Sequence, residues 1–398
     1  MQESSIGRRA FVSAAGLLIA RPETVFGSQA NSAVEIGIVG CGGRGNWIGK
    51  LFQEHANIRI VALADVIRER LEQTRAAFRV EGSRAYHGPK AADELAASKL
   101  DAVVIETPVY YHPSQALAAV NAGRHVFLAK PVAPDVPGCN TILEAGRKAK
   151  GKVSFLVDFQ TRARPVFREA AARIHRGDIG DVGLAQIYYY AGRPAPDRST
   201  PGMDPGLVRI MNWLLDKTLS GDIIVEQNIH VIDLANWYLK GHPVKAYGTG
   251  GRVNWADTKF DTGDCWDHFA VTFVYPNGVH ADFSSNQLTP SYSSLTVRCF
   301  GRKGAADTNY GGLVRITGDN AWAGAEKDDT FTGGAAQNIR DFVAGIHSGD
   351  YLNNAESAVE STLTGILGRT AAYLGREVTW EEMLRRNERY EVNLKLDW

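Results

Sequence analysis

The chain has 398 residues, so two domains are the default expectation, and its apolar content of 44% and charged content of 22% are ordinary for a globular protein. It carries 44 basic and 44 acidic residues, which gives a formal net charge of zero. This balance argues against nucleic acid or an anionic membrane as the main partner, because both are bound through an excess of Lys and Arg. No apolar run reaches the ~18–20 residues that span a bilayer, so we expect no membrane span.

Residues 1–30 have the layout of an export signal. Arg8 and Arg9 precede the apolar run VSAAGLLIA, and small residues at positions 28 and 30 predict cleavage after Ala30. The adjacent arginines favour the twin-arginine route, whereas the alternative interpretation is a basic tail without fixed structure. We therefore expect an exported, periplasmic protein whose fold begins after residue 30.

Residues 33–155 alternate apolar strands with helices. The expected strands lie at 34–39, 58–65, 100–108, 125–131 and 153–160. Their continuous Val, Ile and Leu character indicates a parallel sheet that is covered on both faces. The first domain is therefore predicted to be α/β, with a doubly wound parallel sheet.

The pattern changes after residue 155. A helix is expected at 164–181, a strand at 182–192, a helix at 224–241 and another helix at 354–375. Two alternating strands flank Asn277-Gly278, which is a strong hairpin signal. These features predict a second domain over 156–398, of α+β class with an open, mostly antiparallel sheet.

A glycine-rich turn follows the first strand within VEIGIVGCGGRGNWIGKLF, residues 34–52. The turn Gly40-Cys41-Gly42-Gly43-Arg44-Gly45 opens a predicted helix, and Asp65 ends the next strand twenty residues after Gly45. This context favours a dinucleotide site, with the pyrophosphate at the helix N-terminus and the ribose hydroxyls on Asp65. Asp65 favours NAD as the cofactor, although Arg68 keeps NADP possible. The alternative interpretation of the whole turn is a glycine loop that binds no ligand.

Unusual residues follow three predicted strands, at the sheet edge where ligands of doubly wound folds lie. Proline holds the residue before it in extended geometry, so Lys130 before Pro131 is kept out of a helix and can point into the cleft. The alternative for Lys130 is a solvated loop lysine. The residues at these strand ends are Thr107, Pro108, Tyr110, Tyr111, His112, Lys130, Gln160 and Arg162.

A candidate acid–base group lies in the predicted helix 224–241. Glu226 and His230 are four residues apart and Asp233 is three further on, so all three are expected on one face of that helix. A carboxylate bonded to one imidazole nitrogen raises the basicity of the other nitrogen. Asp233 could instead pair with a residue outside this helix. The alternative interpretation of all three residues is an ion cluster on the protein surface.

Taken together, the glycine turn and the stretches ETPVYYHP, AKPVA and EQNIHVIDLANW resemble the Gfo/Idh/MocA oxidoreductases over residues 34 to about 380. The resemblance implies an N-terminal Rossmann domain that binds NAD or NADP, and an open-faced second sheet that carries substrate contacts and often the oligomer interface. The sequence departs from the family pattern at Ala129, which stands in place of Glu, and at Glu226, which stands in place of Asp.

The resemblance also implies roles for individual residues. The catalytic residues would be Lys130, Glu226 and His230, with His230 as acid or base and Lys130 stabilising the substrate oxygen. The cofactor-binding residues would be Gly40, Gly42, Gly43, Arg44, Gly45, Asp65, Thr107, Pro108, His112, Lys130 and Gln160. The substrate contacts would be Arg162, Tyr189 and Asp233, and no metal site is expected.

The implied activity is hydride transfer between NAD and a sugar, cyclitol or glycoside. Because an exported enzyme finds little free NAD, one alternative is a redox-neutral glycosidase or lyase with a transient 3-keto intermediate, whose extra base would come from Tyr188, Tyr189, Tyr190 or His112. Further alternatives are a sugar–sugar oxidoreductase and a sugar-binding protein without turnover. We also expect a homo-oligomer through the second sheet, since open apolar faces are seldom left wet, and no required disulfide.

Overall fold

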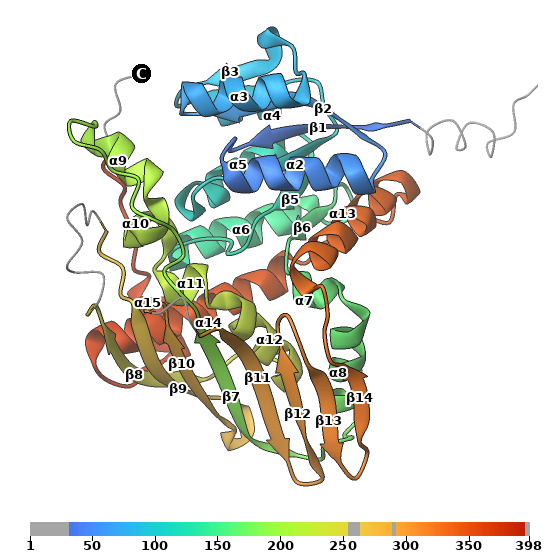
Figure 1. Cartoon of the computed structure of the whole chain (residues 1–398), viewed down its shortest axis with the longest axis vertical. Helices are drawn as coiled ribbons and strands as arrows, with labels where there is room; N and C mark the ends of the chain where they lie inside the picture. Colours follow the sequence, from blue (N-terminus) through green and yellow to red (C-terminus); the bar gives the residue numbers. More distant parts are fainter. Residues whose placement is uncertain (1–31, 254–262, 289–291, 395–398) are drawn as a thin grey trace, which may run out of the picture. The chain divides into compact units, whose positions relative to one another are not determined.

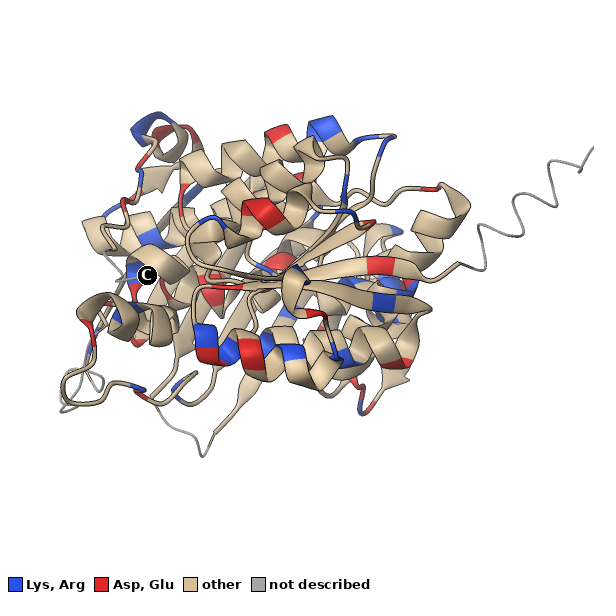
Figure 2. Ribbon diagram, turned by 90° about the horizontal axis from the view of Figure 1, so that it is seen from above, with Lys and Arg blue, Asp and Glu red and all other residues tan. Residues whose placement is uncertain are grey.

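The computed structural model describes residues 32–253, 263–288 and 292–394. The predicted export signal lies outside these residues and stays a prediction. The chain from Val34 onward forms one compact unit, in which all four cysteines are buried as free thiols. None of the described helices is long and apolar enough to cross a membrane. Acidic and basic residues are interspersed along the outer helices (Figure 2).

The first domain is built on a six-stranded sheet of order β3-β2-β1-β4-β5-β6, in which every pairing is parallel (Figure 1). Its strands are β1 (Val34–Val39), β2 (Ile58–Asp65), β3 (Ala85–His87), β4 (Ala102–Ile105), β5 (His125–Leu128) and β6 (Phe155–Val157). The connecting helices are α2 (Gly43–His55), α3 (Arg68–Phe78), α4 (Ala91–Ala97), α5 (His112–Asn121) and α6 (Val136–Ala149). This topology confirms the predicted doubly wound sheet.

Two helices from the end of the chain complete this domain. In α13 (Thr330–Ser348), the ring of Phe342 packs edge-on against Phe52 and Phe127, with ring centroids 6.4 and 5.6 Å apart. Before α14 (Ala355–Leu374), the Asn354 side chain accepts the Val157 N–H at 2.7 Å and donates to the Val157 carbonyl at 2.9 Å. The C-terminal part of the chain therefore covers the first sheet and caps its edge strand.

The second domain contains a nine-stranded sheet of order β14-β13-β12-β11-β7-β10-β9-β8-β15, antiparallel except for the β7–β10 pair. Its strands are β7 (Val182–Tyr190), β8 (Lys245–Gly251), β9 (His268–Val274), β10 (His280–Asn286), β11 (Ser294–Gly301), β12 (Gly304–Asn309), β13 (Val314–Gly318), β14 (Trp322–Ala325) and β15 (Val378–Thr379). This confirms the mostly antiparallel sheet. The other helices are α7 (Gln160–Ala163), α8 (Pro165–His175), α9 (Pro205–Met211), α10 (Lys217–Ser220), α11 (Ile223–Glu226), α12 (Ile229–Leu239) and α15 (Trp380–Arg386).

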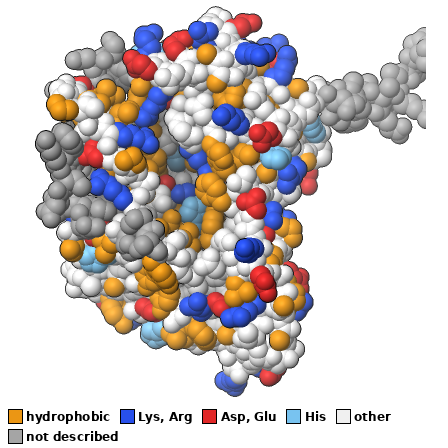
Figure 3. Space-filling model, viewed as in Figure 1, with side chains coloured by type: hydrophobic (Ala, Val, Ile, Leu, Met, Phe, Trp, Pro, Cys, Tyr) orange, Lys and Arg blue, Asp and Glu red, His pale blue; other side chains and the backbone are white. Residues whose placement is uncertain are grey.

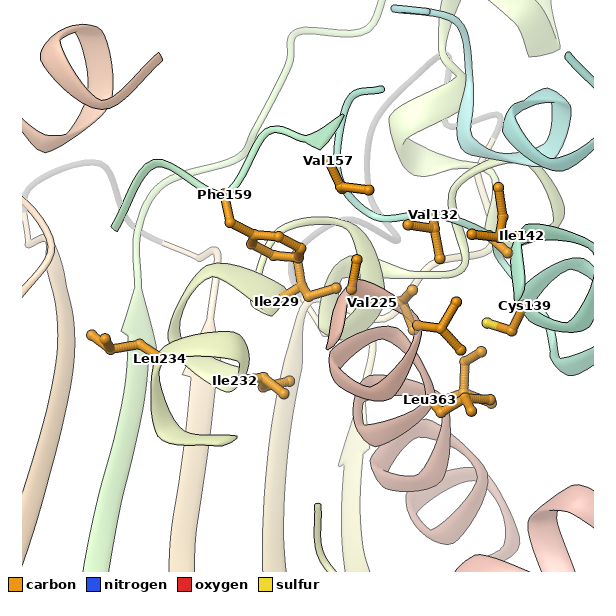
Figure 4. Packing of buried hydrophobic residues seen from close by; sticks show 14 of the residues in the cluster. Val132, Cys139, Ile142, Val157, Phe159, Val225, Ile229, Ile232, Leu234 and Leu363 are labelled. Carbon is orange, nitrogen blue, oxygen red and sulfur yellow. The ribbon is translucent and has the colours of Figure 1, made fainter. Parts of the chain in front are cut away.

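A shared hydrophobic core joins the two domains below the carboxyl ends of β5 and β6. Figure 4 shows Val132 and Phe159, which follow these strands, close to Val225 and Ile229 of the second domain. All four side chains are buried, and each contributes about 1.5–3 kcal/mol by leaving water. This packing holds α11 and α12 against the edge of the first sheet where ligands of such folds lie.

The helix predicted over 224–241 is broken into α11 and α12 at Gln227 and Asn228. The Asn228 N–H donates to the Ile223 carbonyl, five residues back, at 2.8 Å. The Glu226 carbonyl instead accepts a hydrogen bond from Lys130 Nζ at 2.6 Å. The break therefore presents a backbone acceptor to the lysine of the other domain.

Candidate active site

The glycine turn has the geometry that a dinucleotide site requires. Gly40 has a φ of +95°, and a Cβ there would lie 2.6 Å from the Glu106 carbonyl oxygen. A Cβ on Gly45 would lie 1.9 Å from the Gly40 carbonyl oxygen. Gly43 faces open space, and a Cβ on Gly42 would meet only Arg70 at 3.8 Å. Gly40 and Gly45 thus permit the tight turn, while the space over Gly42 and Gly43 fits a pyrophosphate.

Asp65 ends β2 beside this turn. Its carboxylate accepts the Cys41 N–H at 2.6 Å and the Ile67 N–H at 2.7 Å, which fixes its orientation. Burial raises the pKa of Asp65, against the lowering effect of these backbone bonds and of the Arg70 charge. Each oxygen still has a lone pair for a ribose hydroxyl, so Asp65 fits an adenosine ribose.

A cavity of about 370 Å³ runs along the carboxyl ends of the first strands. From the first domain it is lined by Gly40, Gly42, Gly43, Arg44, Asp65, Thr107 and Pro108, among others. From the second domain it is lined by Arg198, Ile210, Trp213, Leu214, Val392 and Leu394. The donor set and the open turn fit the adenosine and pyrophosphate of NAD, and the second domain covers this part of the groove.

Lys130 follows β5, and its side chain contacts the second domain. Its Nζ donates to the Glu226 side chain at 2.9 Å as well as to the Glu226 carbonyl. The two side chains are 12% and 7% exposed. Removal of one partner of such a buried ion pair strongly destabilises a protein, because the other charge is left buried without compensation.

The imidazole of His230, in α12, is buried beside this pair. It is 9% exposed, and its Nδ1 accepts or donates no hydrogen bond within the part of the chain that the structure describes. Burial, assisted by the positive charges of Lys130 and Arg44, holds the pKa of His230 well below its usual value. His230 is therefore a neutral imidazole at neutral pH, which is the protonation state of a general base.

A second polar cluster extends from the glycine turn to His230. Arg44 donates to the buried Asp158 at 2.7 Å, and Asp158 also accepts from the Gln160 amide at 2.8 Å. Gln160 accepts from the Tyr310 hydroxyl at 2.6 Å, and the Tyr310 ring lies 5.0 Å from the His230 ring. This chain of contacts connects the cofactor turn of one domain to the imidazole of the other. Figure 3 shows hydrophobic, basic and histidine side chains around a central hollow of the surface.

Two family models match the chain. A model described as an oxidoreductase family with an NAD-binding Rossmann fold matches residues 34–157, and a Gfo/Idh/MocA C-terminal domain model matches residues 167–307. The chain belongs to the Gfo/Idh/MocA family. It is thus an NAD-dependent oxidoreductase, which accords with the groove beside the glycine turn.

Relatives in the Gfo/Idh/MocA family match most of the chain. The inositol 2-dehydrogenase of Rhizobium meliloti strain 1021 is 27% identical over 324 residues, which cover 79% of this chain and 89% of that protein. The crystal structure of myo-inositol 2-dehydrogenase from Lactobacillus plantarum has a TM-score of 0.68 at 20% identity, and covers 87% of this chain and 99% of its own. A levoglucosan dehydrogenase in complex with NADH and levoglucosan has a TM-score of 0.71 at 17% identity, with coverage of 87% and 99%. At these identities the solved structures show the fold alone.

The pairing expected on helix 224–241 is wrong for this Gfo/Idh/MocA protein. Because the helix breaks, Glu226 turns to Lys130 and not to His230. Asp233 is fully buried, pairs with Arg162 through two oxygens and accepts the Ser361 hydroxyl at 2.8 Å. The alternative for Asp233, a partner elsewhere, is therefore the one that the structure shows, and that partner is Arg162.

His112 is buried between two loops that border the site. Its ring nitrogens contact the carbonyls of Pro131 at 2.7 Å and Thr107 at 2.9 Å, and burial lowers its pKa to about 4. It therefore links the two loops that follow β4 and β5. Gln160, likewise, is 1% exposed and acts within the polar cluster. Neither residue lines the cavity of the glycine turn.

The three consecutive tyrosines at the end of β7 point to alternate faces of the sheet. Tyr189 faces the site and donates to the Gln227 side chain at 3.1 Å. Tyr188 points to the opposite side, where its hydroxyl donates to Asp282 at 2.9 Å and its ring stacks on Tyr190. Of the three, Tyr189 is therefore the one on the side of the sheet that contacts the break between α11 and α12.

Several residues of the site were not anticipated. Glu106 and Asp158 each follow a buried strand, which is a signal that sequence reasoning can use. Tyr310 lies in the turn after β12 and Asn338 lies in α13, where it donates to Asp158 at 2.8 Å. Neither carries a local signal, because only the tertiary fold brings these segments to the site.

Glu106 is expected to make stability depend on pH. Burial raises its pKa from 4.5 to about 7, against the lowering effect of the Arg44 charge. Between these pH values the folded protein holds a proton that the unfolded chain has released, so the free energy of unfolding falls as pH rises. By pH 7 the loss is on the order of 2–3 kcal/mol.

The variant Glu106→Gln isolates this effect. We expect the unfolding free energy of the wild type, minus that of Glu106→Gln, to decrease by that amount between pH 4.5 and 7 in urea titrations. The matched control is Glu94→Gln, at an exposed position of α4. A difference that stays constant across this pH range would contradict the prediction.

Proposed function

We propose that this protein oxidises a secondary alcohol of a sugar, cyclitol or glycoside by hydride transfer to NAD, and reduces the corresponding ketone in reverse. The observation that carries the proposal is the neutral, buried imidazole of His230 beside the Lys130–Glu226 pair. This pair joins the two domains next to the strand ends that border the cofactor groove. The names of the relatives, inositol 2-dehydrogenase and levoglucosan dehydrogenase, support a cyclic polyol as the substrate class.

The residues have complementary roles in this reaction. NAD, when bound, supplies the hydride acceptor. His230 takes the hydroxyl proton during oxidation and returns it during reduction. The Lys130 ammonium hydrogen-bonds the same oxygen and stabilises the negative charge that develops on it. Glu226 acts through Lys130, because its carboxylate and carbonyl hold the ammonium in place.

Direct assay tests the proposal. Purified protein is incubated with NAD and a panel of hexoses, inositols and aryl glycosides, and NADH absorbance and released phenol are followed. We expect NADH to accumulate with at least one cyclic polyol. The proposal is wrong if the NAD-loaded protein oxidises no member of the panel.

A redox-neutral glycosidase remains a second candidate, and the cover over the groove favours it. Residues of the second domain, including Arg198, Trp213 and Val392, line the cavity opposite the glycine turn. Such a cover slows cofactor release, and a retained cofactor suits a cycle that restores its own oxidation state. It also suits the export that we propose from Arg8 and Arg9. Phenol release from an aryl glycoside without net NADH would identify this activity.

We further propose that the protein self-associates through the outer face of the nine-stranded sheet. Large apolar side chains are exposed on three of its strands, at Leu184, Tyr247 and Phe300. Tyr292, shortly before β11, is exposed as well. Burial of such a face is favourable in proportion to its apolar area. We expect sedimentation to give a mass above that of one chain, and Tyr247→Glu to reduce it. A monomeric wild type at high concentration would contradict this.

A further inference from the structure

Two aromatic side chains from opposite ends of the sequence stack beside the site. Trp47 lies in the second turn of α2, and Phe331 lies in the first turn of α13. Their ring centroids are 5.0 Å apart, with an angle of 27° between the ring planes. Phe331 is nevertheless 49% exposed, so the pair presents an aromatic surface to solvent. We call Trp47, Phe331 and Arg44 the aromatic platform.

Arg44 fixes this platform relative to the site. Its guanidinium carbon lies 4.4 Å from the centre of the Trp47 ring and 5.5 Å from that of Phe331. On its other side the guanidinium is bound to Asp158, whose side chain is fully buried, and lies 3.4 Å from Glu106. The same Asp158 connects through Gln160 and Tyr310 to His230. A chain of side-chain contacts therefore links the platform to the group that we propose as the base.

The fold itself does not require an aromatic residue at position 331. The N-terminus of α13 is capped by Asp329, whose side chain accepts the Thr332 N–H at 3.2 Å, so a polar residue at position 331 would serve the helix equally well. A half-exposed Phe also gives up much of the roughly 1.5–3 kcal/mol that full burial of its side chain would supply.

We propose that the aromatic platform is a second sugar subsite, which binds the pyranose ring attached to the ring that is oxidised. This inference rests on the proposed function and narrows its substrate class from free polyols to disaccharides and longer glycosides. A pyranose presents an apolar face of C–H groups that stacks on an aromatic ring, and its edge carries hydroxyls. The planar, always charged guanidinium of Arg44 donates hydrogen bonds to such hydroxyls in fixed directions.

The test compares Phe331→Ala with the wild type on paired substrates. The probes are glucose, galactose and myo-inositol, and the disaccharides cellobiose, lactose and maltose. Loss of one stacking contact is expected to raise KM for a disaccharide about tenfold, with kcat nearly unchanged. KM for the free sugars is expected to stay within about twofold. Phe331→Tyr keeps the ring and is expected to restore the wild-type KM.

Two controls make the test decisive. Leu384→Ala removes an apolar side chain that is 37% exposed in α15, outside the aromatic platform and the proposed self-association face, and is expected to leave both sets of KM values unchanged. Calorimetric titration of NAD-loaded protein with each disaccharide gives a readout that is independent of turnover. Binding that depends on Phe331 without any oxidation would overturn the proposed function and keep the subsite. Equal effects of Phe331→Ala on free sugars and disaccharides, or no effect, or no disaccharide binding at all, would overturn the subsite.

Discussion

His230→Asn is expected to lower kcat for alcohol oxidation by about 10²–10⁴-fold while the protein keeps its affinity for NAD. Asparagine retains a polar group of similar size in α12 but accepts no proton near neutral pH. The groove at the glycine turn is lined by other residues, so the dissociation constant of NAD is expected to stay within a few fold of the wild-type value. Steady-state kinetics and calorimetric titration with NAD check the two parts separately.

The wild-type pH profile gives a second readout for His230. As a base, the imidazole must be neutral, and burial with the Lys130 and Arg44 charges keeps its pKa well below 6.5. The kcat/KM for oxidation is therefore expected to lose no activity through protonation of His230 as pH falls from 8 to 6.5, and to show its acid limb well below pH 6.5. An acid limb at or above pH 6.5, or full activity of His230→Asn, would exclude this imidazole as the base.

The first domain could be predicted from the sequence because its signals are local. A strand buried on both faces must be apolar throughout, so each strand of the parallel sheet appears as a continuous run. The glycines at 40 and 45 are dictated by contacts of 2.6 and 1.9 Å that no side chain can satisfy, which ties that motif to its geometry. Lys130 is a candidate for the same kind of reason, because the proline after it restricts its backbone.

The site's pairings could not be predicted in this way, because they depend on tertiary contacts. Spacing placed Glu226 and His230 on one helical face, but the ammonium of Lys130 binds the Glu226 carbonyl and carboxylate at a break in that helix. Asp233 followed the same helical spacing, yet the guanidinium of Arg162 engages it. Tyr310 reaches His230 from a turn 80 positions later in the sequence, so periodicity within one segment carries no information about it.

Lys130→Met is expected to lower kcat about 10²–10³-fold and to move the acid limb of the remaining activity to higher pH. The first effect follows from the loss of the ammonium that we place on the reacting oxygen. The second follows from the sign of the charge: Lys130 lowers the pKa of His230, so its removal raises that pKa. An acid limb that does not move would contradict the placement of this charge beside His230.

Loss of the lysine also leaves the Glu226 carboxylate buried without its partner, which costs about 3–5 kcal/mol of stability. The double variant Lys130→Met/Glu226→Gln removes both charges and is expected to recover most of that stability without recovering kcat. Thermal unfolding of the two variants, measured beside the pH profiles, separates folding from catalysis. If the double variant regained activity together with stability, Lys130 would act only by holding the two domains together. If both variants stayed folded while kcat remained about 10²–10³-fold lower, the ammonium would act on the reacting oxygen itself.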